Sequence, residues 1–212
     1  MFTYLRTIDR FTFANSNGLI NRDMLVLDDF LEISQFKKLQ NIVLSYDFPW
    51  FYIPNVSLPP GSQIEDPQAL ETMGYLHTVY DFESENKSFL LEGMEPFISA
   101  YEKKFQKINK LLRIRISKKH PRIGFTKDNY NLPHVDLPIP HTTLIYYLND
   151  SDGDTRVFDQ FHINDIEPKI FTTKARIKPK ENRLLKLDGL NYHTASNPFD
   201  HDRRIVLNVN LI

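Results

Sequence analysis

The stretch that decides the fold runs from Asn131 to Asp150 and reads NLPHVDLPIPHTTLIYYLND. A histidine and an aspartate, His134 and Asp136, stand two residues apart, and a strongly apolar run that is typical of a buried strand follows. In an extended segment, residues two apart point to the same side, so both side chains can reach one ion. The pair alone is a weak signal, because surface loops also carry this spacing by chance.

The composition limits the kinds of site that the chain can build. Its 212 residues are 41% hydrophobic and 13% aromatic, which is enough for one sizeable core. The sequence has no cysteine, which excludes disulfides, thiolate catalysis and cysteine zinc sites, so any metal must be held by His, Asp or Glu. A net charge of −1 gives no electrostatic footprint for nucleic acid, and we expect no such partner.

The N-terminal stretch MFTYLRTIDRFTFANSNG alternates polar and apolar residues and lacks the continuous apolar core of a signal peptide. No window of the sequence approaches the ~18 apolar residues of a membrane span. We therefore expect a soluble protein of the cytoplasm, with no membrane partner.

Hydrophobic periodicity predicts a chain that is helix-rich early and strand-rich late. Asp28 and Asp29 are cap candidates before a helix over about 30–45, and a second helix is expected over 88–110. Short alternating or apolar runs predict strands at 74–82, 111–117, 142–148, 155–158, 183–187 and 204–212. No linker divides the sequence, so we expect a single domain over 1–212, in which 1–110 supports a β core over 111–212.

A three-ligand metal site needs a second histidine from a distant part of the chain. The 2-His-1-carboxylate site of non-haem Fe(II) oxygenases combines such a pair with one distant histidine and leaves coordination positions open. Arg204 opens an alternating strand after His193, and an Arg at the mouth of a strand is a good bidentate anchor for a carboxylate. The histidines that follow Asp136 are His141, His162, His193 and His201.

In order and spacing, these features resemble the Fe(II)/2-oxoglutarate-dependent oxygenase superfamily, specifically its prolyl-hydroxylase-like branch. That family has an HxD pair, a Y-Y-L-N strand, a strand that begins near a Gly, a turn into R-L-L, a distal His and a basic residue on the last strand. The match covers about 111–212 and consists of His134-x-Asp136, TLIYYLND (143–150), GDTRVF (153–158), KPKENRLLKL (178–187), Tyr192-His193 and Arg204.

The resemblance implies a mainly β fold with flanking helices, a double-stranded β-helix (jelly roll, cupin-like) with N-terminal helical support. It implies that His134, Asp136 and His193 bind Fe(II) as the catalytic centre. Arg204 is then expected to pair with the distal carboxylate of 2-oxoglutarate, and Tyr147 to donate a hydrogen bond to the same group.

A second arginine competes with Arg204 for the carboxylate. Arg203 stands ten residues after His193, where many relatives have their basic residue. We favour Arg204, because the family also has a small polar residue four positions later, where Asn208 fits. Asn208 and Thr143 are then expected to face the cosubstrate pocket.

The implied activity is an Fe(II)- and 2-oxoglutarate-dependent dioxygenase that hydroxylates an unactivated C–H bond on a prolyl or other peptidyl side chain. Its cosubstrates are 2-oxoglutarate and O2, with ascorbate as a candidate reductant. The alternatives are a hydroxylase of a free amino acid, small molecule or nucleobase, and a non-catalytic cupin-like metal-binding protein. A zinc hydrolase with the same three ligands leaves Arg204 and Tyr147 unexplained.

Overall fold

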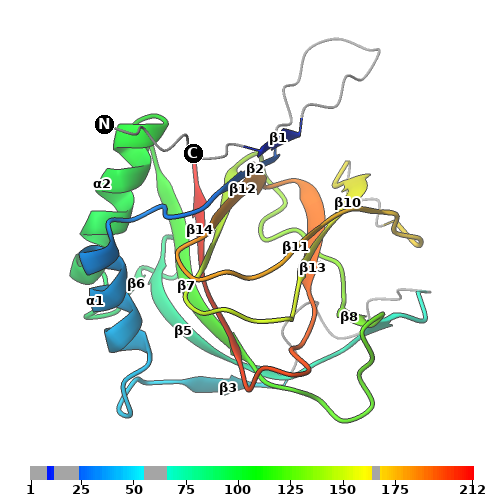
Figure 1. Cartoon of the computed structure of the whole chain (residues 1–212). Helices are drawn as coiled ribbons and strands as arrows, with labels where there is room; N and C mark the ends of the chain where they lie inside the picture. The colour runs from blue at the N-terminus through cyan, green and yellow to red at the C-terminus, as the bar shows by residue number, and fades with distance from the viewer. Residues whose placement is uncertain (1–8, 12–23, 55–65, 164–167) are drawn as a thin grey trace, which may run out of the picture.

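A computed structural model describes residues 9–11, 24–54, 66–163 and 168–212 of the chain. Two antiparallel sheets face each other, and two helices lie on the outside of the larger one (Figure 1). The helices are α1 (Ile33–Val43), the 3-10 turn η1 (Glu92–Met94) and α2 (Glu95–Lys104). The strands are β1 (Asp9–Phe11), β2 (Met24–Leu27), β3 (Phe51–Ile53), β4 (Ala69–Leu70), β5 (Gly74–Asp81), β6 (Asn86–Lys87), β7 (Leu111–Lys119), β8 (Tyr130–Asn131), β9 (Thr142–Tyr147), β10 (Thr155–Phe161), β11 (Thr173–Ile177), β12 (Leu184–Asp188), β13 (Asn191–Ala195) and β14 (Arg204–Leu211).

The larger sheet has the strand order β1-β2-β12-β9-β14-β7-β5-β3, with β6 paired to β5. The smaller sheet has the order β11-β10-β13, and β4 and β8 form a short parallel pair. Ile145 and Leu185 of the larger sheet pack in one buried cluster with Val157 and Ile177 of the smaller sheet. The two sheets therefore close on each other around a partly apolar interior.

Strands β7 and β14 direct alternate side chains to the core beneath the helices and to the inner face of the sheet. On β14, Ile205, Leu207, Val209 and Leu211 belong to the main hydrophobic core beneath the helices. The residues between them, Arg204, Val206 and Asn208, line a cavity on the inner face. Successive side chains of a strand point to opposite faces, so one strand serves the core and the cavity at once.

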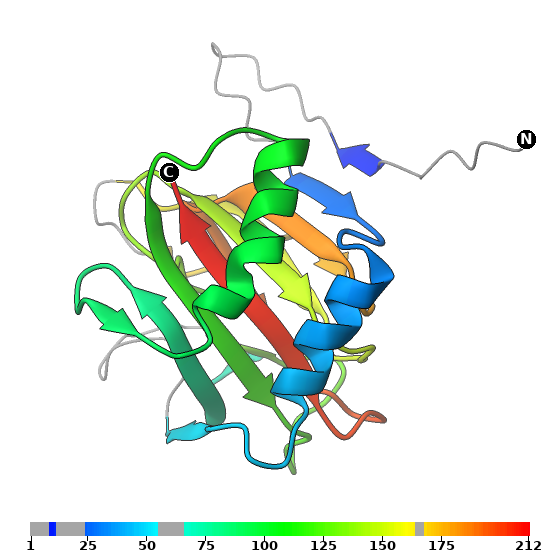
Figure 2. The same ribbon diagram turned by 90° about the vertical axis from the view of Figure 1, so that its left-hand side faces the viewer.

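The two helices cover the outer face of the larger sheet, as expected, and Figure 2 shows them lying across its strands. Phe36 of α1, Phe97 of α2 and Tyr146 of β9 are buried in the same core. Their aromatic rings pack edge-on or tilted, with centroids 5.2–6.2 Å apart for the two pairs with Tyr146. Neither helix has the length and hydropathy needed to cross a membrane, among the residues described.

The second helix is shorter than the sequence predicts. It ends at Lys104, whereas its hydrophobic pattern continues to Lys110. The backbone N–H groups of Asn109 and Lys110 donate instead to the carbonyl of Ile212, at 2.7 and 2.8 Å. Pairing with the C-terminal residue therefore replaces the last turns of the expected helix.

The cap expected for the first helix is also wrong. Asp28 accepts hydrogen bonds from Arg183 at 2.6 Å and from Lys180 at 3.0 Å, and Asp29 has a positive φ of 52°. The helix begins later, at Ile33, with Glu32 at the N-cap position and no side-chain cap. The aspartates therefore join the chain to the turn before β12, rather than cap the helix.

Asn182 fastens the segment before α1 to the β core. It is buried, its φ is 61°, and its side-chain Oδ1 accepts hydrogen bonds from the Leu31 N–H at 2.9 Å and the Tyr146 hydroxyl at 2.6 Å. Its Nδ2 donates to the Leu31 carbonyl at 2.9 Å. Asparagine tolerates the left-handed conformation better than most residues, which suits this position.

We expect Asn182→Ala to lower the free energy of unfolding by about 2–4 kcal/mol, because buried backbone groups lose their partners and alanine adopts this positive φ less readily than asparagine does. Urea unfolding measures the change. Asn182→Gly keeps the backbone conformation accessible and isolates the hydrogen-bond contribution. The exposed Asn86→Ala is the control, and an equally small effect for both alanine variants would contradict this role.

Candidate active site

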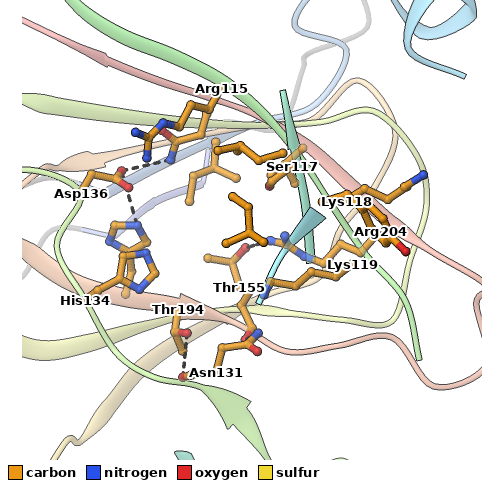
Figure 3. Close-up of a pocket in the computed structure, with 18 of the residues that line it drawn as sticks. Arg115, Ser117, Lys118, Lys119, Asn131, His134, Asp136, Thr155, Thr194 and Arg204 are labelled. Atoms are coloured by element: carbon orange, nitrogen blue, oxygen red, sulfur yellow. Dashed lines mark hydrogen bonds and ion pairs between the residues drawn. The ribbon is translucent and has the colours of Figure 1, made fainter. Parts of the chain in front are cut away.

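The cavity lies between the inner face of the larger sheet and β13 of the smaller one, and its volume is about 240 Å³. His134 and Asp136 lie on one side, and Arg204 and Lys119 reach in from the other (Figure 3). His193 also lines the cavity and lies close to His134 and Asp136. Val206, Ile145 and Leu76 contribute apolar surface. The arrangement is a pocket with a candidate metal end and a cationic end.

The three expected ligands come together. His134 forms an isolated antiparallel bridge with His193, in which each backbone N–H donates to the other carbonyl at 3.0 Å. Asp136 lies two residues further on, and one ligand atom from each of the three residues lies within 4.8 Å of the others. The backbone bridge thus fixes how close the two imidazoles come, with ring centroids 5.0 Å apart.

Both imidazoles are oriented by their own backbone surroundings. The Nδ1 of His134 lies 3.1 Å from the Leu132 carbonyl, and the Nδ1 of His193 lies 3.0 Å from the Asn191 carbonyl. With Nδ1 of each ring engaged by the backbone, Nε2 is the nitrogen that each ring can offer to a metal. Burial, with the nearby His193, lowers the pKa of His134 to about 4, so this ring is neutral at physiological pH.

The Asp136 carboxylate is held by donors from three strands. Its Oδ2 accepts hydrogen bonds from Asn208 at 3.0 Å, Asn210 at 2.9 Å and Thr143 at 3.2 Å. Its Oδ1 lies 3.3 Å from Arg113. Burial disfavours the charge, but His193 and Arg113 outweigh it and hold the pKa of Asp136 well below its usual range. The group is therefore a carboxylate, ready to act as a ligand.

This donor set fits a divalent transition metal. Two imidazole nitrogens and one carboxylate, with the cavity beside them, are the ligands of a 2-His-1-carboxylate site, which suits Fe(II). The His134 ring is neutral and the Asp136 carboxylate is ionised, so neither of these two ligands has to lose a proton before it binds a metal.

The cationic end is built around Thr155. Arg204 is buried, and it donates from Nε to the Gly153 carbonyl and from Nη2 to the Thr155 Oγ1, both at 2.7 Å. The Tyr147 hydroxyl donates to the same Oγ1 at 2.6 Å. Because Thr155 Oγ1 accepts both bonds, its own proton is left to donate to a ligand in the cavity.

The structure distributes the expected cosubstrate residues over two places. Arg204 lines the cavity, whereas Tyr147 reaches it only through Thr155. Asn208 lines the cavity at the metal end, and Thr143 is fully buried behind Asp136. Arg203 lies outside the cavity, with its side chain 43% exposed and 3.7 Å from Asp202.

Several residues of the site were not singled out from the sequence, among them Arg113, Lys119, Thr155 and Asn210. The signal for two of them was the alternation of LLRIRISKK, which puts Arg113 and Lys119 on the same face of β7. Asn210 lies on the face of β14 already assigned to Arg204 and Asn208. Thr155 lies within the matched segment GDTRVF, but no local pattern assigns its hydroxyl to the cationic end.

Several solved structures share this architecture. The non-haem α-ketoglutarate-dependent epimerase SnoN from nogalamycin biosynthesis has a TM-score of 0.58 at 9% identity, covering 89% of this chain and 78% of that one. A prolyl hydroxylase from Trichoplax adhaerens, in complex with a hypoxia-inducible factor peptide, has a TM-score of 0.53 at 16% identity, covering 89% and 83%. A prolyl-4-hydroxylase from Pseudomonas putida has a TM-score of 0.54 at 11% identity, covering 90% and 92%. SnoN was also solved with Fe3+ and α-ketoglutarate.

No protein-family model and no curated protein sequence matches the chain. At these identities, the structural likeness establishes the fold. The chain has the double-stranded β-helix fold of the Fe(II)/2-oxoglutarate oxygenases, and the fold class predicted from the sequence is confirmed. Prolyl hydroxylases are among the structures with a similar fold, as are other 2-oxoglutarate oxygenases.

We expect Asn210→Ala to weaken divalent metal binding by about 10–100-fold, because residues that orient a metal ligand typically contribute that much. Titration of the apoprotein with Mn(II) or Fe(II) measures the change. The exposed Asn109→Ala is the control, and thermal unfolding of each variant checks that the β core is intact. Unchanged metal affinity in folded Asn210→Ala would show that Asp136 does not need the hydrogen bond from Asn210.

Proposed function

We propose that the chain is an Fe(II)- and 2-oxoglutarate-dependent dioxygenase that hydroxylates an unactivated C–H bond on a prolyl or other peptidyl side chain. The observation that carries this proposal is that one cavity has a candidate metal site at one end and a buried cation at the other. A His-Asp-His cluster suited to Fe(II) lies opposite a buried arginine suited to a carboxylate.

His134, Asp136 and His193 hold the metal in this proposal, and Arg204 binds the distal carboxylate of 2-oxoglutarate. When bound, Fe(II) with 2-oxoglutarate and O2 supplies the oxidation that converts a C–H bond to an alcohol, with succinate and CO2 as coproducts. The protein's part is to bind, orient and exclude water.

The residues around these anchors support those roles. Thr155 lies between Arg204 and Tyr147 and offers a hydroxyl proton to the same carboxylate. Burial raises the pKa of Tyr147, which keeps its phenol protonated as a donor. Ile145 and Val206 supply apolar walls that limit water in the cavity.

Two features support a peptidyl substrate over the alternatives. Prolyl hydroxylases are among the structures with this fold, and one of them was solved with a peptide. A small-molecule substrate is the second candidate, because the epimerase SnoN from nogalamycin biosynthesis has the same fold. A metal-binding scaffold without turnover is disfavoured, because it has no use for a buried arginine at the far end of the cavity.

We expect Asp136→Ala to abolish both Fe(II) binding and succinate release from 2-oxoglutarate, while the protein stays folded. The measurement is succinate formation with a panel of prolyl peptides and free amino acids, and ascorbate in all reactions. Stimulation by a peptide supports the peptidyl assignment, and stimulation by amino acids alone favours the small-molecule alternative. Retention of metal and turnover in the variant rules out this ligand set.

We expect Arg204→Ala to weaken 2-oxoglutarate binding by about two to four orders of magnitude, because two charge-assisted hydrogen bonds of ~1.5–3 kcal/mol each are lost. Metal binding is expected to persist. Arg204→Lys is expected to be intermediate, because the charge remains while the planar fork is lost.

The matched control for this test is Arg203→Ala, which removes an exposed guanidinium next in the sequence. The measurement is a 2-oxoglutarate titration of Mn(II)-loaded wild-type and variant proteins. If Arg203→Ala weakens 2-oxoglutarate binding and Arg204→Ala does not, Arg203 is the anchor. If neither substitution changes the affinity, the metal-binding scaffold is favoured.

A further inference from the structure

The inner face of β7 carries a row of cations toward the cavity. Arg113, Arg115 and Lys119 alternate with buried apolar residues and all line the cavity. Arg113 lies 3.3 Å from Asp136, and Arg115 lies 3.5 Å from Asp81. Lys119 ends this row at the cationic end.

Among the described residues, the buried Lys119 has no acidic partner. It is 7% exposed, and its Nζ donates to Thr72 Oγ1 at 3.2 Å. In the ranges that the structure describes, no ion pair joins either Lys119 or Arg204 to a carboxylate. A buried cation is costly unless an opposite charge compensates it.

The register of the sheet places Lys119 beside the proposed carboxylate anchor. Lys119 of β7 and Arg204 of β14 are direct partners across the antiparallel pair. Figure 3 shows Arg204 and Lys119 on the same side of the cavity, opposite His134 and Asp136, with Thr155 between the two sides. Like charges directly opposite each other repel, so an anion that enters between them is favoured by both.

We propose that Lys119 is a second anchor for the distal carboxylate of 2-oxoglutarate, acting with Arg204 from the neighbouring strand. This inference rests on the proposed function. Side chains from two neighbouring strands then bind one carboxylate: Arg204 through its planar guanidinium and Lys119 through its compact ammonium charge.

A second property of Lys119 makes its role measurable by pH. Burial and the charge of Arg204 lower the pKa of Lys119 to about 7. The charged or titratable groups that face it are Arg204 on β14 and His134 before β9, and Thr72 is neutral. Bound carboxylate favours the protonated amine, so 2-oxoglutarate is expected to bind more weakly as the pH rises above about 7.

The test compares two ligands that differ only at the distal end. 2-Oxoglutarate carries the distal carboxylate, and 2-oxopentanoate has a methyl group in its place. Calorimetric titration of the full-length Mn(II)-loaded protein gives the affinity for each. We expect Lys119→Met to weaken 2-oxoglutarate binding by about tenfold to hundredfold, the equivalent of one charge-assisted hydrogen bond, and to leave 2-oxopentanoate unchanged.

Three further measurements separate this role from a structural one. Lys119→Arg keeps the charge and is expected to retain most of the affinity. The loss of affinity above pH 7 is expected in the wild type and absent in Lys119→Met. The exposed Lys87→Met on β6 is the matched control, and thermal unfolding is expected to show Lys119→Met at least as stable as wild type, because a desolvated cation is removed.

The outcomes distinguish this inference from the function on which it rests. Wild-type protein that binds no 2-oxoglutarate overturns both. Wild-type binding with unchanged affinity in Lys119→Met overturns the role of Lys119 alone. An equal loss for 2-oxoglutarate and 2-oxopentanoate also overturns it, because the lysine then acts away from the distal carboxylate.

Discussion

The buried carboxylate of Asp136 is the group on which the arrangement of this site depends. A negative charge inside a protein must be compensated, and here Arg113 comes from β7, Thr143 from β9, and Asn208 and Asn210 from β14. Each donor reaches the carboxylate only if its strand keeps the observed register. The same contacts that compensate the charge therefore align three neighbouring strands and fix one corner of the candidate metal centre.

Core and cavity are built from the same strands, separated only by the direction of alternate side chains. The outward residues of β14 pack beneath α1 and α2, and its inward residues line the cavity. The helices therefore support the site without contributing to it: they bury the outer face, and burial of that face holds the inner face in place. This division explains how a cavity that holds several charged side chains can lie beside an extensive apolar core.

Sequence patterns predicted those parts of the molecule that depend on local spacing. The two-residue spacing of His134 and Asp136 and the alternation after Arg204 were sufficient to place these residues on faces. The N-terminal strands that extend the larger sheet, and the shortened α2, depend on partners far away in the chain, such as the pairing of Lys110 with Ile212. Thr155 belongs to the cationic end only because β10 lies opposite β14, a relation that no local pattern contains.

The alternation of inward and outward side chains along β14 limits which mutations the chain can tolerate during evolution. A single substitution can be tolerated, because it changes the contacts of one side chain only and leaves the direction of the others unchanged. Insertion or deletion of one residue is different, since every side chain beyond it is turned to the other face. The arginine and asparagines of β14 would then point into the hydrophobic core, and its leucines would point into the cavity. Substitutions are therefore tolerated along β14, whereas insertions and deletions are confined to the connections between strands.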